Sequence, residues 1–271
     1  MPDKAHRWTD ARLGQVERDM LKIYSSTKGK ANALVENRLG EIDSIARDAG
    51  NDAEQVVRFY LIGLGIAASL ARELAEIAVE TDIAAIDMAN MTVADVCDRN
   101  MSYMGRELSA ILKLSVSVVA LPIVPYAVVD RDKDSSWNVR RMLAALLSAS
   151  TEGGIVDSVK SHVSTVIDMD MRSAKRAART AVTRAEAVGR LEAMRAASRL
   201  GANVEKQWVA VMDSRTRKSH AYLDGQHVPL DKPFVTEGGI ELMYPADPDC
   251  HEPSEVYNCR CTIKPWSVDN A

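Results

Sequence analysis

Proline is distributed unevenly along this sequence, and its distribution limits where long helices can form. Only Pro2, Pro122 and Pro125 precede residue 201, whereas six prolines lie in the last 71 residues. An internal proline removes a backbone donor and clashes with the preceding turn of a helix. Aromatic residues make up only 5% of the chain, so its apolar side chains are mostly helix-compatible aliphatic residues and Met. We therefore expect the first two thirds to be mainly helical and the last third not to be.

The composition excludes several classes of protein. With 271 residues, 46% hydrophobic and 27% charged, the chain suits one large domain or two ordinary ones. Collagen-like, disordered and disulfide-rich secreted chains are excluded. No secretory signal is visible, so the four cysteines are expected to be free thiols or metal ligands. The apolar segment 114–129 contains two prolines and is shorter than the roughly 20 residues of a membrane span, which predicts buried core and no membrane anchor.

Apolar residues recur at helical spacing through the first 150 residues, which we assign to a helical N-terminal region. A first helix is expected from Thr9 to the Gly50-Asn51-Asp52 break, and a second from Asp52. Asp82 or Thr92 is a candidate cap for a further helix. Residues 130–136 are predicted to form an exposed charged loop, followed by a helix over 138–148.

A second domain is expected over 151–271. Residues 151–154 break the pattern, a long helix is predicted over 155–200, and Gly201 is its expected C-cap. Strand-like segments follow at 207–212, 240–244 and 259–265, with a hairpin over 220–230 about Asp224-Gly225. The predicted fold class is α+β: a mainly helical N-terminal region, a long basic helix and a small antiparallel sheet.

The long helix is strongly basic. Residues 172–199 hold eight basic and two acidic side chains, a net charge of +6. Because the whole chain has a net charge of −4, the other residues together carry a net charge of −10. One interpretation is a solvated face, or a face paired with the acidic remainder. The other is contact with DNA phosphates or an acidic partner. The candidate contact residues are Arg172, Lys175, Arg176, Arg179, Arg195 and Arg199.

A first cluster of reactive side chains lies between residues 213 and 220. An enzyme interpretation makes His220 a general acid or base, with Arg215 or Arg217 stabilising charge on a phosphodiester. The alternative is a polar loop in which Asp213 caps the turn and pairs with an arginine. No other proton-transfer group except His227 is close in sequence, so no catalytic residue is assigned.

A second cluster contains cysteines. Cys259 and Cys261 are two residues apart, so in a strand both side chains face the same side. With Cys250 and His220 they offer four ligands of the type zinc prefers, which would give a zinc-stabilised DNA-binding module. The alternative is a set of small buried thiols.

The last third of the chain resembles the phage Mu F-like head morphogenesis family. Read in order, its segments look like W-x4-D-x-R-T-R-x2-H-x2-L-D-G-Q, then F, then Y-P-x-D-P, then N-C-R-C-T. The resemblance covers roughly residues 155–266. The residues that carry it are Trp208, Asp213, Arg215, Arg217, His220, Asp224, Gly225, Phe234, Tyr244, Pro245, Asn258, Cys259, Arg260 and Cys261.

The resemblance implies a structural minor capsid protein of a tailed phage rather than an enzyme. Such a protein is expected inside the virion head near the portal, and in the host cytoplasm during assembly. Its implied partners are the portal protein, the major capsid or scaffolding protein, and the packaged DNA. The nuclease-like enzyme and the zinc-stabilised DNA-binding module remain the alternatives.

Overall fold

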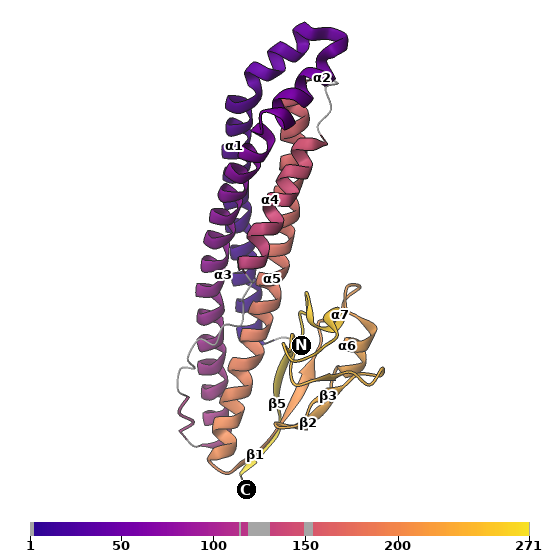
Figure 1. The fold of residues 1–271 in the computed structure, drawn as a ribbon. Coiled ribbons are helices and arrows are strands. Elements are labelled where there is room, and N and C mark those ends of the chain that lie inside the picture. Colours follow the sequence, from indigo (N-terminus) through magenta and orange to yellow (C-terminus); the bar gives the residue numbers. More distant parts are fainter. Residues whose placement is uncertain (1–2, 114, 119–130, 149–153, 271) are drawn as a thin grey trace. The chain divides into compact units, whose positions relative to one another are not determined.

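The computed structural model describes residues 3–113, 115–118, 131–148 and 154–270, and long helices precede a small sheet (Figure 1). The α+β fold class predicted from the sequence is therefore confirmed. The helical elements before the sheet are α1 (Lys4–Ala49), a 3-10 turn (Gly50–Asp52), α2 (Ala53–Arg58), a π-helical turn (Phe59–Gly63), α3 (Ile66–Leu112), α4 (Arg131–Leu147) and α5 (Ile155–Arg199). The elements after α5 are β1 (Ala202–Val209), α6 (Lys218–Leu223), β2 (His227–Pro229), β3 (Phe234–Val235), β4 (Glu241–Leu242), α7 (Pro253–Val256) and β5 (Thr262–Asn270).

Several predictions about the helices were wrong. α1 begins at Lys4, so Thr9 lies inside it, and Asp82 lies inside the uninterrupted α3. Residues 131–136 are not a loop but the first turns of α4, because a charged sequence without Gly or Pro is compatible with a helix. Thr92 does not cap a new helix; its hydroxyl donates to the Met88 carbonyl inside the uninterrupted α3. None of the described helices is long and apolar enough to cross a membrane. Most of the apolar segment 114–129 lies outside the described residues, and within it Val116 is buried.

The predicted hairpin over 220–230 was also wrong. Residues 218–223 form the short helix α6, and β2 pairs antiparallel with β1 instead. The turn at Gly225 does have the positive φ (82°) that its Asp-Gly sequence indicates. β1 is the central strand of the three-stranded sheet β2-β1-β5, because β5 pairs along its other edge. β3 and β4 form a separate two-stranded pair.

The chain divides into two compact units, neither continuous in sequence: Met1–Val16 with Met88–Ala127 and Arg176–Ala271, and Glu17–Asp87 with Val128–Lys175. The predicted boundary at residue 150 stays a prediction. The core of the second unit consists of aliphatic side chains from α1, α3, α4 and α5, among them Leu39, Leu74, Met142 and Val163. The Asp43 carboxylate of α1 accepts a hydrogen bond from the Ile155 nitrogen (2.6 Å) and so caps the start of α5.

The first unit buries a charged network between its helices and its sheet. The Arg190 guanidinium is fully buried and donates to Asp3 (2.7 and 2.8 Å), to the Asn100 side-chain oxygen (3.1 Å) and to the Ile263 carbonyl (3.2 Å). It also lies 2.9 Å from Glu186. Such a buried charge is tolerated because every partner is present.

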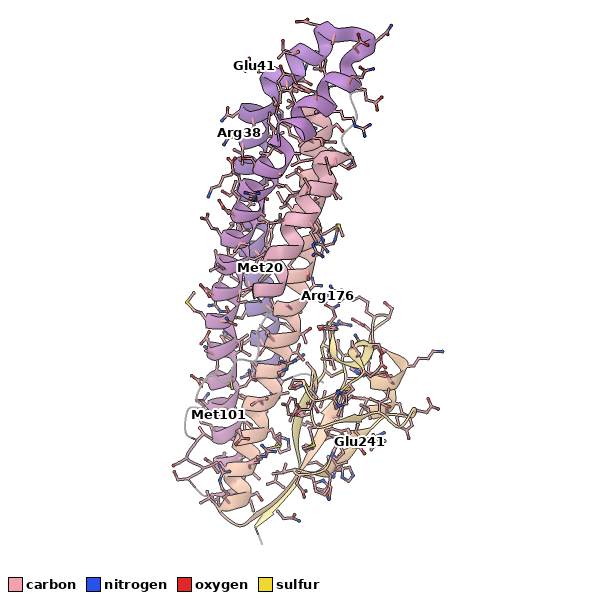
Figure 2. All side chains as sticks on the ribbon, viewed as in Figure 1. Met20, Arg38, Glu41, Met101, Arg176 and Glu241 are labelled. Carbon is pink, nitrogen blue, oxygen red and sulfur yellow. The ribbon has the colours of Figure 1, made fainter. Side chains whose placement is uncertain are left out.

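The first unit also contains a very close approach between two helices. Gly189 of α5 lies against the backbone of α3 at Cys97 and Met101. Met101, which is labelled in Figure 2, is buried in the same unit. A Cβ on Gly189 would clash with the Cys97 carbonyl oxygen and lie 3.1 Å from the Met101 nitrogen. Only glycine therefore fits at this crossing.

Gly189→Ala is expected to lower the free energy of unfolding by about 1–3 kcal/mol, because backbone atoms cannot move aside as a side chain would. Gly40→Ala in α1 is the matched control, since a Cβ there meets nothing within 4 Å. It should raise stability by up to about 1 kcal/mol through helix propensity. Urea unfolding followed by circular dichroism measures both. Equal stability of the two variants would contradict the close crossing.

Candidate functional site

A row of side chains on α5 holds the segment 258–263, which carries two of the candidate cysteines. The segment enters through Asn258, whose φ of 56° lies in the left-handed region that Asn tolerates. The Asn258 nitrogen donates to the Thr180 hydroxyl (3.3 Å), and the Arg190 guanidinium donates to the Ile263 carbonyl (3.2 Å). Between them, the Thr183 hydroxyl donates to the Cys259 carbonyl (2.7 Å), and the Thr262 hydroxyl donates to Glu186 (2.8 Å).

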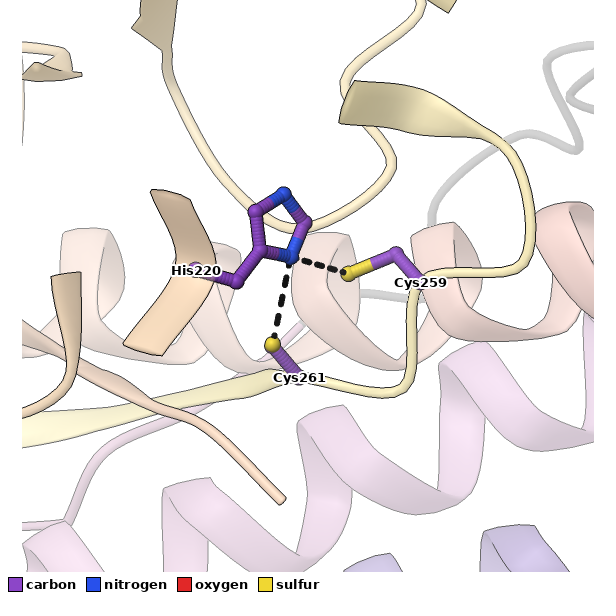
Figure 3. A group of neighbouring side chains, drawn as sticks. All are labelled: His220, Cys259 and Cys261. Carbon is purple, nitrogen blue, oxygen red and sulfur yellow. Dashed lines mark hydrogen bonds between the residues drawn. The ribbon is translucent and has the colours of Figure 1, made fainter. Parts of the chain in front are cut away.

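This segment brings Cys259 and Cys261 to His220 of α6. The His220 Nδ1 atom lies 3.5 Å from the sulfur of each cysteine, and Figure 3 shows both thiols facing this atom of the ring. All three ligating atoms lie within 4.8 Å of one another. The residues are 2%, 1% and 4% exposed for His220, Cys259 and Cys261 respectively, so the cluster is closed to solvent.

Aromatic rings and a carboxylate enclose the other sides of the His220 ring. Trp208 of β1 makes edge-to-face contacts with His220 (ring centroids 5.3 Å apart) and with Phe234 (5.2 Å). The His220 Nε2 atom lies 3.0 Å from the Glu255 carboxylate of α7. The Ser219 hydroxyl donates to the same carboxylate (2.8 Å) and holds it in place.

The surroundings of the two thiols shift their pKa values in opposite directions. Burial raises the pKa of Cys259, which is fully enclosed. Donation from the Cys259 thiol, together with the neighbouring His220, lowers the pKa of Cys261.

Cys250, the fourth predicted zinc ligand, lies outside this group of three. Its thiol is half-buried and faces the Glu252 carbonyl oxygen at 3.8 Å. Sequence alone suggested a four-residue set because all four residue types suit zinc, but it could not show which side chains converge.

The Asp213–Arg217 loop is held by contacts that the loop interpretation anticipated. Asp213 accepts two hydrogen bonds from the Arg260 guanidinium (2.8 and 2.6 Å) and one from the Arg215 nitrogen (2.9 Å). These donors hold the pKa of the Asp213 carboxyl well below its usual range. The Arg217 guanidinium donates to the Tyr257 carbonyl.

This geometry does not assemble the groups of the nuclease alternative around an open site. His220 is buried against thiols, whereas the Arg215 side chain is 76% exposed on the surface. The prediction that His220, Arg215 and Arg217 act together on a phosphodiester stays a prediction without geometric support.

Other motif residues also make contacts that form the fold. The Asp224 carboxylate accepts from the Ala210 nitrogen (2.8 Å), and the Gly225 nitrogen donates to the Trp208 carbonyl (3.0 Å). Phe234 is fully buried, and Tyr244 packs against the same core. Pro245 precedes Ala246, whose carbonyl accepts from Arg184 of α5 (2.8 Å). Many residues of the motif series are thus explained by contacts that stabilise the fold of this unit.

The basic residues of α5 divide into two groups. Arg184 and Arg190 point into the first unit and donate hydrogen bonds to backbone carbonyls. These two of the eight basic side chains therefore stabilise the fold. Arg172, Arg176 and Arg199 are exposed, and Figure 2 labels Arg176 on α5. Lys175, Arg179 and Arg195 are half-buried, and Arg195 pairs with Glu192 (2.6 Å).

Two residues that bear on the site were not predicted from the sequence. Glu255 contacts His220 across 35 residues, and its only sequence signal is its place in a short helix that begins with Pro253. Lys206 is buried in β1, where its ammonium donates to the Met243 carbonyl (2.8 Å), and burial lowers its pKa to about 8. An alternating strand pattern gives no reason to expect a lysine on the buried face.

Arg260→Met is expected to raise the pKa of Asp213 toward about 3.9, its ordinary value, because the largest stabilising donor is removed. Arg215→Met is the matched control: its guanidinium is 3.8 Å from Asp213, and its backbone donor is retained, so the shift should be smaller. Carboxyl carbon NMR titration measures both values. An Asp213 pKa that is the same in Arg260→Met and wild type would show that the ion pair does not form in solution.

Comparisons with known proteins agree with these motifs. The sequence profile described as Phage Mu protein F like protein matches residues 140–264. The chain is 28% identical over 130 residues to "Minor head protein GP7" of Bacillus phage SPP1, covering 46% of this chain and 40% of that protein. It is 30% identical over 121 residues to "NAD(+)--arginine ADP-ribosyltransferase EFV" of Enterococcus faecalis, covering 43% of this chain and 23% of that protein.

The matched regions are thus less than half the length of either relative. No solved structure matches the chain. The family profile covers the end of α4, the whole of α5 and most of the sheet that α5 holds. The resemblance expected from the ordered motifs is confirmed: residues 140–264 match the Phage Mu protein F like family.

Proposed function

We propose that this protein is a structural minor head protein of a tailed phage. The observation that carries the proposal is the Phage Mu protein F like domain over residues 140–264, joined to the similarity with a minor head protein of phage SPP1. We place the protein inside the virion head near the portal. There it would assist head assembly and the packaging or delivery of DNA, after assembling in the host cytoplasm.

A structural role is supported by how the domain uses its polar residues. The side chains most suited to catalysis, those of His220 and the two neighbouring cysteines, are buried. Asp213 and Arg260 pair with each other. These contacts stabilise a compact scaffold, and the surface remains available for binding to other head components.

Exposed arginines on α5 support contact with an acidic partner. Arg172, Arg176 and Arg199 are exposed, and Lys175 is half-buried between the first two along the helix. We propose that these side chains face the packaged DNA or an acidic surface of the portal, major capsid or scaffolding protein. Charge attraction of this kind is long-ranged at low salt and does not require a deep pocket.

The test is to purify DNA-filled heads from cells in which the phage replicates and to locate the protein in them. The protein is expected in the heads by mass spectrometry, resistant to protease in intact heads and digested after the heads are opened. Amine-reactive cross-linking of the same heads should join Lys175 or a neighbouring lysine to the portal protein.

Two results would overturn the proposal. Heads that lack the protein would exclude a minor head protein. Protein that is digested equally in intact and opened heads would contradict a position inside the head.

A further inference from the structure

We propose that His220, Cys259 and Cys261 bind one zinc ion, with the His220 Nδ1 atom and the two cysteine sulfurs as its protein ligands. This site does not depend on the proposed role in the phage head. The three residues come from α6 and from the segment that α5 holds, and their ligating atoms converge. Both thiols would bind as thiolates, so binding releases protons from the cysteines.

The distances between the ligating atoms fit zinc. Zinc binds thiolate sulfur at about 2.3 Å and histidine nitrogen at about 2.0–2.1 Å in tetrahedral geometry. Those bond lengths place nitrogen and sulfur ligands about 3.5 Å apart. The His220 Nδ1 atom lies 3.5 Å from the Cys259 sulfur and 3.5 Å from the Cys261 sulfur. Both pairs therefore already have the separation that a shared zinc ion requires.

The surroundings of His220 match those of a metal ligand. A zinc-bound histidine commonly directs its second ring nitrogen to a carboxylate, which fixes the tautomer and the ring orientation. The second ring nitrogen of His220, Nε2, lies 3.0 Å from Glu255, whose carboxylate also accepts from Ser219. The His220–Glu255 pair is close but is not aligned as a hydrogen bond. We assign Glu255 as the positioning residue that would accept from Nε2 when Nδ1 binds the metal.

The ion would join two parts of the domain. α6 follows β1, whereas Cys259 and Cys261 precede β5, and the bound zinc would link these segments in addition to the α5 contacts. Because all three ligating residues are almost fully buried, a substrate does not reach them. Because the site is closed to substrate, we assign the ion to stabilising the fold, even though a set of three protein ligands with a small fourth ligand such as water is the coordination typical of catalytic zinc.

Cys250 lies outside this ligand set, so the proposed site uses three of the four residues predicted from the sequence. Its sulfur faces the Glu252 carbonyl, and it is not among the three converging residues. The same substitution at Cys250 and at Cys261 therefore distinguishes the proposed ligand from a nearby thiol that does not bind metal.

The first test uses the wild-type chain and needs no variant to fold. Protein produced in zinc-supplemented medium and purified without chelator is expected to hold about 1 equivalent of zinc by mass spectrometry. Replacement with cobalt should give a thiolate-to-cobalt charge-transfer band and tetrahedral visible bands. Less than about 0.1 equivalent of zinc, or cobalt spectra without thiolate bands, would overturn the proposal.

The second test compares variants whose folding is checked by circular dichroism. Cys261→Ser should lose the zinc, whereas Cys250→Ser should keep about 1 equivalent. Glu255→Gln should retain zinc stoichiometry but bind it about 10–100-fold more weakly in competition with a chromophoric chelator. Loss of zinc from Cys250→Ser, or unchanged affinity in Glu255→Gln, would contradict the ligand set or the role of Glu255 respectively.

Discussion

The hydrogen bonds from α5 to residues 258–263 are the interaction on which the sheet of the first unit depends. Thr183 and Arg190 bind main-chain carbonyls of this segment, and Glu186 binds the Thr262 side chain. The segment leads into β5, which completes the sheet by pairing with β1. Because α5 is long and its side-chain spacing is regular, it fixes the segment at several points at once. Removing one partner would leave a buried polar group unpaired, which costs more than the bond itself contributes.

The same contacts explain why a family motif without a complete catalytic set has so many polar residues. Asp213 pairs with Arg260, Asp224 accepts from the backbone, and His220 faces two thiols through Nδ1. Each of these residues joins segments that are distant in sequence. The motif is therefore a set of fold-forming contacts, and function is expected on the surface, where the exposed arginines of α5 lie. That division suits a protein proposed to act by binding other head components.

Sequence reasoning succeeded where local patterns decide the structure. Proline distribution and helical spacing located the helical front, the long α5 and the change to strands, and the ordered motifs identified the family. Predictions failed where contacts between residues distant in sequence determine the local structure. The segment 220–223 has strand-like residues but forms α6, because β2 finds its partner in β1. The roles of Glu255 and Arg190 could not be found, since Glu255 contacts His220, 35 residues away, and Arg190 binds Ile263, 73 residues away, besides Glu186 on its own helix.

Hydrogen exchange of the segment 258–263 tests the dependence on α5 most directly. Thr183→Val keeps the side-chain shape but removes the hydroxyl that donates to the Cys259 carbonyl. Thr165→Val is the matched control, because that exposed hydroxyl bonds only within α5, to Ser161. Mass spectrometry should show faster exchange across 258–263 in Thr183→Val and unchanged exchange in Thr165→Val. Equal protection in Thr183→Val and wild type would contradict the account.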